Sequence, residues 1–343
     1  MQFDKLDLSK LDWLNLLPRF GVDASLIANP KRLGPCPIEN EGKTRFRLAN
    51  KNGRGNWYCN QCGSGDGVRL VGLMMGCNDA AAIHLIRNLE SPGNIKGPPV
   101  RVQALAHKPK NVEKERRLLQ QVWDATVSPV NTFVEEYIHR RVPLFNMSWL
   151  SASVRAHPAL YHMDTETKKV SFRPAMVTRV CGLDGKPVTL HRTYLSPDGF
   201  KADVTPDQVK KQMTGIVDLN GEAITLNQPV LQSRVLVVAE GNETGLALVA
   251  STSNRHVVRA ALNAGNLAKL KVSRSEFDQV IICADRDHVN KHNGWRVGEH
   301  YAEILQQRLL SEGFKVRIKA PVVDGTDFAD LWFDRCSKLL RLA

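Results

Sequence analysis

Two stretches decide the fold of the last third of the chain: "VLVVAEGNETGLAL" at residues 235–248 and "VIICADRDHVN" at residues 280–290. Each starts as an apolar, β-branched run typical of a buried strand and then turns acidic. In open parallel sheets the active crevice lies at the carboxyl ends of the strands. Alternate residues of an extended segment point the same way, so Asp285 and Asp287 can aim at one point. Glu240 faces that point too if the two strands are neighbours.

Three converging carboxylates would repel one another, and some would have to take up protons. Mg²⁺ or Mn²⁺ relieves this repulsion, because Mg²⁺ prefers oxygen ligands and keeps waters and substrate phosphates in its coordination sphere. We therefore predict that Glu240, Asp285 and Asp287 are catalytic metal ligands for phosphoryl or nucleotidyl transfer. A lone D-x-D motif would carry little weight, and the strand-E-G-helix before it makes the pattern specific.

The strands in this region alternate with segments of helix length. Apolar, β-branched runs begin at residues 234, 256, 279 and 314, as "RVLVVAE", "HVVRAAL", "QVIICAD" and "FKVRIKAP". This alternation predicts a parallel α/β sheet that is covered on both faces by helices.

The motifs "EGNETGLAL", "AALNAGNLAKL", "ADRD" and "DGTDFADL" resemble the successive motifs of a Toprim domain. Toprim is the catalytic module of bacterial DnaG-type primases, topoisomerases and several nucleases, and the nearest resemblance is to phage and plasmid primases. It implies that Glu240 is the Toprim glutamate, that Asp285 and Asp287 form the D-x-D motif, and that Asp327 is a late metal-holding acid. Glu243, Asp324 and Asp330 would be outer members of the site.

The resemblance to phage primases extends upstream through "EEYIHRRVPL", "VRAHPALYH", "FRPAMVTRV" and "TLHRTYLSPDGFKA". It implies that His191, Arg192 and Lys201 belong to a basic surface beside the acidic site. Such a surface would hold template phosphates or the incoming ribonucleoside triphosphate. The alternative is an ordinary strand with solvated charges.

An incomplete zinc ribbon lies near the start of the chain. "CPIENEGKTRFRL" begins at Cys36 and "WYCNQCGSGDG" supplies Cys59 and Cys62, but Glu39 stands where the first pair should be completed. Primases of this class carry an N-terminal zinc ribbon that contacts template DNA. We predict that zinc is bound by the three cysteines with Glu39 as the fourth ligand, since carboxylate oxygen also binds zinc. A metal-free ribbon held by its own packing is the alternative.

Basic and aromatic residues alternate around the ribbon cysteines. Arg45 and Arg47 flank Phe46, and Trp57 and Tyr58 precede the second cysteine pair. Basic residues beside exposed aromatic rings suit single-stranded nucleic acid, so Arg45, Arg47 and Trp57 are candidate contacts to DNA. In the competing interpretation, Trp57 and Phe46 form the small core of the ribbon.

Composition agrees with a nucleic-acid partner. Of the 343 residues, 47 are Lys or Arg and 35 are Asp or Glu, a formal net charge of +12, which favours a polyanionic partner. The sequence shows neither a signal peptide nor an apolar run of the roughly 18 residues that a membrane span needs. Seven unevenly spaced cysteines then favour a reducing cytoplasm.

We therefore expect a multi-domain α/β protein of four segments. A zinc-ribbon-like β domain with helices spans residues 1–90, and a basic, proline-rich linker spans 91–112. A mixed α+β polymerase subdomain spans 113–230, and the Toprim domain with its parallel sheet spans 231–343.

The predicted function is that of a DNA primase that makes short RNA primers on single-stranded DNA from ribonucleoside triphosphates. The alternatives are a Toprim nuclease and a non-catalytic, single-stranded DNA-binding or regulatory protein of a mobile element. The sequence contains no G-x-x-x-x-G-K-[ST] phosphate loop, so we expect any helicase partner to be a separate chain. The resemblance alone suggests a phage or plasmid origin.

Overall fold

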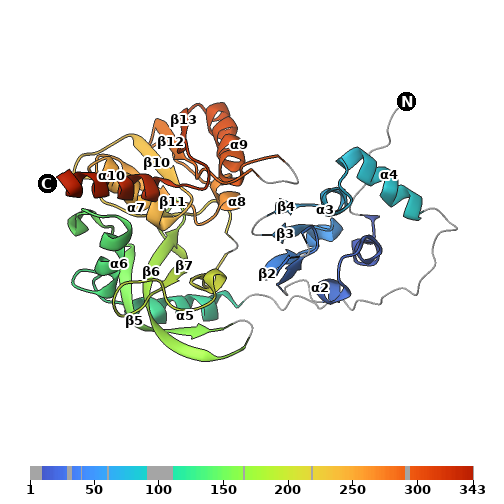
Figure 1. Ribbon diagram of the computed structural model, residues 1–343, viewed down its shortest axis with the longest axis horizontal. Helices are drawn as coiled ribbons and strands as arrows, with labels where there is room; N and C mark the ends of the chain where they lie inside the picture. Colours follow the sequence, from blue (N-terminus) through green and yellow to red (C-terminus); the bar gives the residue numbers. More distant parts are fainter. Residues whose placement is uncertain are drawn as a thin grey trace. The chain divides into compact units, whose positions relative to one another are not determined.

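The computed structural model describes residues 10–28, 33–39, 41–59, 62–90, 111–164, 167–217, 219–289 and 294–342 (Figure 1). It divides into an N-terminal unit, which includes the segment Val289–Trp295, and a larger unit that starts at Pro109. Most of the predicted linker, 91–112, lies outside the described residues. Within the described chain, every helix is too short or too polar to cross a lipid bilayer.

The N-terminal unit is a small antiparallel sheet bracketed by helices. The strands follow one another in the order β1 (Gly34–Cys36), β2 (Glu41–Leu48), β3 (Trp57–Cys59) and β4 (Gly63–Gly65). The helices are α1 (Trp13–Leu16), η2 (Leu17–Phe20), α2 (Ala24–Ala28), α3 (Gly67–Met74) and α4 (Asp79–Glu90), and η3 (Lys51–Gly53) is a short turn. Asn78 accepts a hydrogen bond from the Ala81 amide at 2.9 Å and so caps α4.

The larger unit begins with a second antiparallel sheet. Its order is β5 (Val154–Met163), β6 (Val170–Cys181), β7 (Pro187–Tyr194) and β8 (Lys210–Gln212). Helices α5 (Val112–Asp124) and α6 (Phe133–Arg141) precede it, and η4 (Met147–Trp149) and η5 (Pro206–Gln208) are single turns. This is the mixed α+β arrangement that we expected for the middle of the chain.

The C-terminal sheet contains the predicted parallel strands. Its order is β13 (Lys315–Lys319), β12 (Gln279–Cys283), β10 (Val235–Ala239), β11 (Val257–Ala260) and β9 (Ile224–Thr225), and all neighbours are parallel except β9. The helices are α7 (Asn242–Ser251), α8 (Ala264–Leu267), α9 (Val297–Ser311) and α10 (Phe328–Leu342). Separate cores on the two faces confirm that helices cover both sides of the sheet.

The two sheets of the larger unit share one core. Ile138 of α6 and Met176 of β6 are buried together with Ala239 of β10 and Leu246 of α7. The backbones also meet, because Cys181 and Ala223 exchange hydrogen bonds of 2.9 and 3.1 Å. As a result, side chains of the first sheet can be held against the carboxyl ends of the second.

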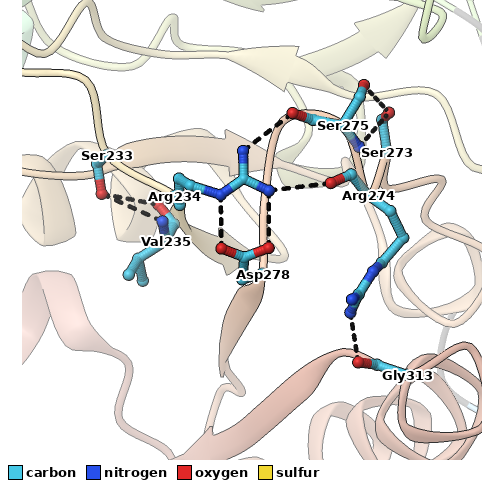
Figure 2. Close-up of polar contacts among 8 residues, drawn as sticks. All are labelled: Ser233, Arg234, Val235, Ser273, Arg274, Ser275, Asp278 and Gly313. Carbon is cyan, nitrogen blue, oxygen red and sulfur yellow. Dashed lines mark hydrogen bonds and ion pairs between the residues drawn. The ribbon is translucent and has the colours of Figure 1, made fainter.

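The amino ends of the parallel strands are tied together by one arginine. Figure 2 shows Arg234, just before β10, facing Asp278, just before β12. Its Nε and Nη2 donate to the two carboxylate oxygens at 2.5 and 2.7 Å. Nη1 and Nη2 also donate to the carbonyls of Ser275 and Arg274 at 3.0 and 3.1 Å. Such a two-pronged pair fixes orientation better than a single contact does.

We expect Arg234→Lys to lower the Tm of the protein by a few degrees. Lysine keeps the charge but cannot reproduce the planar set of four contacts that joins two strand ends. Thermal unfolding followed by circular dichroism measures the change. The control is Lys186→Ala, which removes a single exposed contact to Asp184. Equal Tm values for the two variants would show that the arginine contacts add nothing.

Candidate functional site

The strand register brings the predicted acids together. Ala239 at the end of β10 lies opposite Cys283 at the end of β12, so Glu240 and Asp285 follow at the same edge of the sheet. This confirms that the two strands are neighbours. Burial and the charge of Asp287 raise the pKa of Glu240 to about 7. Burial and the charges of Glu240, Asp327 and Asp287 raise the pKa of Asp285 to about 8.

Helix α9 holds Asp287 in place. The amide of Gly298, in the first turn of α9, donates to Asp287 Oδ2 at 2.7 Å, and Arg296 Nη1 donates to the Asp287 carbonyl at 2.7 Å. A Cβ at position 298 would lie 2.8 Å from the Asp285 carbonyl oxygen, so only glycine allows this approach. The positive end of the helix therefore lies against the D-x-D loop.

Asp327 joins the site while capping α10. Its Oδ1 accepts from the amides of Ala329 and Asp330 at 2.7 and 2.9 Å, and its Oδ2 accepts from the Thr244 hydroxyl at 3.2 Å. Of the outer acids, Asp330 accepts from the Asp327 amide at 3.1 Å. Asp324 instead forms an ion pair of 3.0 Å with Arg296. These two carboxylates support the loop that carries Asp327.

Glu243 connects the two sheets. Tyr137 of α6 donates to its Oε1 at 2.5 Å, and Lys210 of β8 donates to its Oε2 at 2.8 Å. Burial acts to raise the pKa of Glu243, but the charge of Lys210 and these hydrogen bonds outweigh it and hold the pKa below its usual range. Glu243 is therefore a charged anchor for Lys210.

The basic residues expected beside the acids are divided between two faces. His191 lies directly opposite Thr178, and Arg192 directly opposite Val177, so the two side chains point to opposite sides of the sheet. Burial, helped by Lys210, lowers the pKa of His191 to about 4, so its ring is neutral. Arg192 lies over the Tyr194 ring at 5.7 Å, on the face away from Lys210. The structure thus does not group Arg192 with the acids.

Lys201 does lie near the acids. Burial lowers the pKa of Lys201, while the nearby charges of Glu243 and Asp327 act to raise it. Lys210 was not among the sequence candidates. It belongs to a short strand without hydrophobic periodicity, and its partner Glu243 is 33 residues away, so only the fold identifies it.

The acidic group fits a divalent cation. Asp285 Oδ1 is buried without a hydrogen-bond partner, and so are both polar side-chain atoms of Asn242, two residues after Glu240. Buried groups of this kind normally have partners, and oxygen donors are what Mg²⁺ and Mn²⁺ prefer. Within the described residues, no three of these carboxylates have ligand oxygens within 4.8 Å of one another.

The ribbon forms a tighter group. The sulfurs of Cys36, Cys59 and Cys62 all lie within 4.8 Å of one another, and all three residues are buried. The contact with Cys59 and burial raise the pKa of the Cys36 thiol, while the backbone amides of Glu39 and Ile38 act to lower it. Three gathered thiols fit zinc. The Glu39 carboxylate is not part of this group and forms an ion pair with Arg45. Its role as the fourth ligand stays a prediction.

Trp57 belongs to the ribbon core. Its side chain is only 2% exposed, it stacks on Phe46 with ring centroids 5.9 Å apart, and its Nε1 donates to the Asp66 carbonyl at 3.0 Å. A ring that is packed on its own domain has no free face for a base, so the expectation that Trp57 stacks on DNA is corrected. Arg47 is exposed and lies 5.8 Å from the centroid of the Tyr58 ring.

Comparison with protein families identifies two of these regions. Residues 31–68 match the zinc-binding domain of primase-helicase, and residues 235–338 match the Toprim domain. Residues 113–226 match a domain of unknown function (DUF7146). The chain thus combines the zinc ribbon and the Toprim domain of Toprim-type primases, which confirms the resemblance that the motifs indicated.

Solved structures give weaker likenesses. The DnaG catalytic core is 17% identical over 65% of this chain and 75% of its own, with a TM-score of 0.41. The primase fragment of the bacteriophage T7 primase-helicase protein is 13% identical over 49% and 61%, with a TM-score of 0.34. The RNA polymerase domain of Mycobacterium tuberculosis DnaG is 12% identical over 67% and 81%, with a TM-score of 0.38. The zinc ribbon and the Toprim domain are therefore identified by the matches to the domain families.

We expect Asp285→Asn to raise the Tm of metal-free protein at pH 8 by about 2–4 °C. The pKa of Asp285 rises from 3.8 to about 8 on folding, so the wild type loses stability as the pH rises from about 4 to about 8. The amide carries no charge, so the difference in Tm should grow over that interval. Thermal unfolding in chelator at pH 5 and pH 8 tests this, with Asp184→Asn as an exposed control. A lower Tm for Asp285→Asn at pH 8 would contradict it.

For the ribbon, we expect about one zinc per chain and a large loss of zinc in Cys59→Ser. Cys77→Ser, a half-buried cysteine outside the group, should keep its zinc. Glu39→Cys should bind zinc more tightly than the wild type, because a thiolate would complete a four-sulfur site. Metal analysis and competition with a chromogenic chelator measure both effects. Zinc well below one equivalent in the wild type would rule out the site.

Proposed function

We propose that this protein is a DNA primase that joins ribonucleotides on a single-stranded DNA template. The observation that carries the proposal is the register of β10 and β12, which brings Glu240 and Asp285 to one edge of a Toprim sheet. The zinc ribbon of the primase-helicase type in the same chain supports nucleic acid as the substrate.

In this proposal, Glu240, Asp285, Asp287 and Asp327 hold divalent cations, with Mg²⁺ as the expected ion. The cations would lower the barrier by stabilising charge on the attacking 3′-oxygen and on the α-phosphate. Glu240 and Asp285 give up their protons when the cation binds, because opposite charge favours the ionised carboxyl. Asp287 and Asp327 stay oriented by the amides of α9 and α10.

Lys201 and Lys210 supply positive charge beside the acids. Glu243, itself held by Tyr137, holds Lys210 from one side, so the Lys210 ammonium can face a phosphate without losing its position. We propose that these two lysines contact the triphosphate or the template backbone. His191 is neutral on the same face as Lys210 and can donate or accept a hydrogen bond without adding charge. The ribbon, through Arg47, would contact the template.

The test is incubation with single-stranded DNA, four ribonucleotides and Mg²⁺. We expect short RNA products from the wild type and a loss of at least about a hundredfold in Asp285→Ala, because one ligand to the charge-stabilising ion is removed. Affinity for single-stranded DNA, measured by fluorescence anisotropy, should stay within about twofold. Asp184→Ala, an exposed aspartate in a turn, is the matched control.

Two other outcomes are informative. Shortened template with the wild type alone, and no RNA, would replace the primase by a Toprim nuclease. Tight DNA binding without synthesis or cleavage, in either Mg²⁺ or Mn²⁺, would leave a non-catalytic binding protein.

A further inference from the structure

The hairpin of β5 and β6 presents an apolar surface on one side. Tyr161 lies directly opposite Phe172, and Met163 directly opposite Val170, so all four side chains share one face. Their exposed fractions are 45%, 67%, 38% and 47%. The two rings meet edge to face with centroids 6.1 Å apart. We call these four residues the hairpin platform.

Further along β6, the same face is fully buried. Met176, Thr178 and Val180 continue the alternation from Phe172 and are 0% exposed, beneath the core shared with the C-terminal sheet. The platform is therefore the part of this apolar face that the core shared with the C-terminal sheet does not cover. Isolated apolar residues on a surface are ordinary, but four neighbours on one face form a patch.

The back of the hairpin fixes the platform in place. Tyr194 donates its hydroxyl proton to the Tyr161 carbonyl at 2.6 Å, and Lys211 Nζ donates to the Met163 carbonyl at 2.7 Å. Leu160 and His162, which alternate with the platform residues, are buried on that side. The backbone under the exposed rings is thus held before any ligand arrives, which lowers the entropy cost of binding.

The platform face leads to the proposed active site. In the register of the sheet, Met176 lies opposite Thr193 and Thr193 opposite Lys210, so Lys210 projects from the platform's side of the sheet. Lys210 is the residue that contacts Glu243. One side of a single sheet therefore carries both the exposed rings and Lys210.

The turn of the hairpin carries two lysines beside two acidic residues, Asp164 and Glu166. Lys168 and Lys169 occupy the hairpin turn and are exposed. Asp164, in the same turn, accepts from the Thr167 amide at 2.7 Å and from Gln208 at 3.2 Å, so its carboxylate is already engaged. Exposed rings beside lysines are the combination that binds single strands, by stacking on bases and pairing with phosphates.

We propose that the hairpin platform binds single-stranded nucleic acid, with Tyr161 and Phe172 stacking on bases. The assignment of that strand as the one copied at the acidic site rests on the proposed primase function. Template DNA and RNA product share the chemistry, and the experiment separates them. A stable interface with a protein partner or a second copy of the chain would need a larger surface than these four residues supply.

The test is the affinity of the full chain for fluorescein-labelled dT16 and rU16, measured by anisotropy without nucleotides. We expect Tyr161→Ala and Phe172→Ala each to weaken binding about five- to tenfold, as the loss of one stacked base predicts. Phe172→Leu should lose nearly as much, because leucine keeps the apolar surface but not the ring. A larger effect on dT16 assigns the template, and a larger effect on rU16 assigns the product.

The matched control is Phe333→Ala, which removes a ring that is 45% exposed on α10. It should leave binding unchanged. Replacing Lys168 and Lys169 together by Ala should reduce the slope of log affinity against log salt by about one to two. Strands carrying 5-iodouracil should crosslink under ultraviolet light to the hairpin peptide, and mass spectrometry would identify the site.

Unchanged affinity in both ring variants, with the wild-type Tm retained, would overturn the platform. So would full binding by Phe172→Leu together with a wild-type mass that rises with concentration and a Phe172→Ala mass that does not, because this pattern indicates self-association through the platform. These assays do not depend on RNA synthesis. If the wild type makes no RNA but the ring variants still bind DNA more weakly than the wild type, the primase proposal is rejected. The proposal that the platform binds single strands is then retained.

Discussion

Repulsion between buried carboxylates is the constraint on which the rest of this site depends. Glu240 and Asp285 are placed at one edge by the pairing of β10 with β12. Burial raises the pKa of both carboxyls; the charge of Asp287 adds to the shift of Glu240, and the charges of Glu240, Asp327 and Asp287 add to that of Asp285. A sheet built from apolar strands tolerates this cost because the cores on its two faces supply the stability. In the proposed function, this unfavourable arrangement would give a divalent cation its affinity, since ion binding would remove the repulsion.

The acids are not equivalent, and their surroundings separate their roles. Asp287 and Asp327 each accept amide hydrogen bonds at the start of a helix, which keeps them oriented. Asp285 keeps one buried oxygen without a hydrogen-bond partner. Glu243 is committed to Lys210 and Tyr137, and thereby joins the antiparallel sheet to the Toprim sheet. Carboxylates of the same domain thus differ in whether they have a free oxygen, accept helix amides or link two sheets.

The sequence revealed the parts of this site that depend on local pattern. Strands that end in Glu240 and Asp285 are visible from apolar runs and their neighbouring acids. Their adjacency was only a condition, because β11 lies between β10 and β12 in the chain, and the pairing of the two strands in the fold supplies it. Tyr137 was not found, because its partner Glu243 lies 106 residues away and neither residue stands out locally. Trp57 was ambiguous for a different reason: in a domain this small the same ring can form the core or a binding surface, and only packing decides.

The sequence leaves the role of the hairpin platform open in the same way, but here packing leaves the aromatic rings on the surface. Phe172 follows the same alternation as Met176, so its pattern in the sequence is that of a core residue, yet it lies beyond the elements that cover the sheet. An exposed aromatic hairpin on an edge strand invites unwanted strand pairing, and a bulge near Pro158 and the lysines of the turn reduce that risk. The hairpin therefore has features that protect exposed rings without burying them. That combination is expected where the rings serve a ligand rather than the fold.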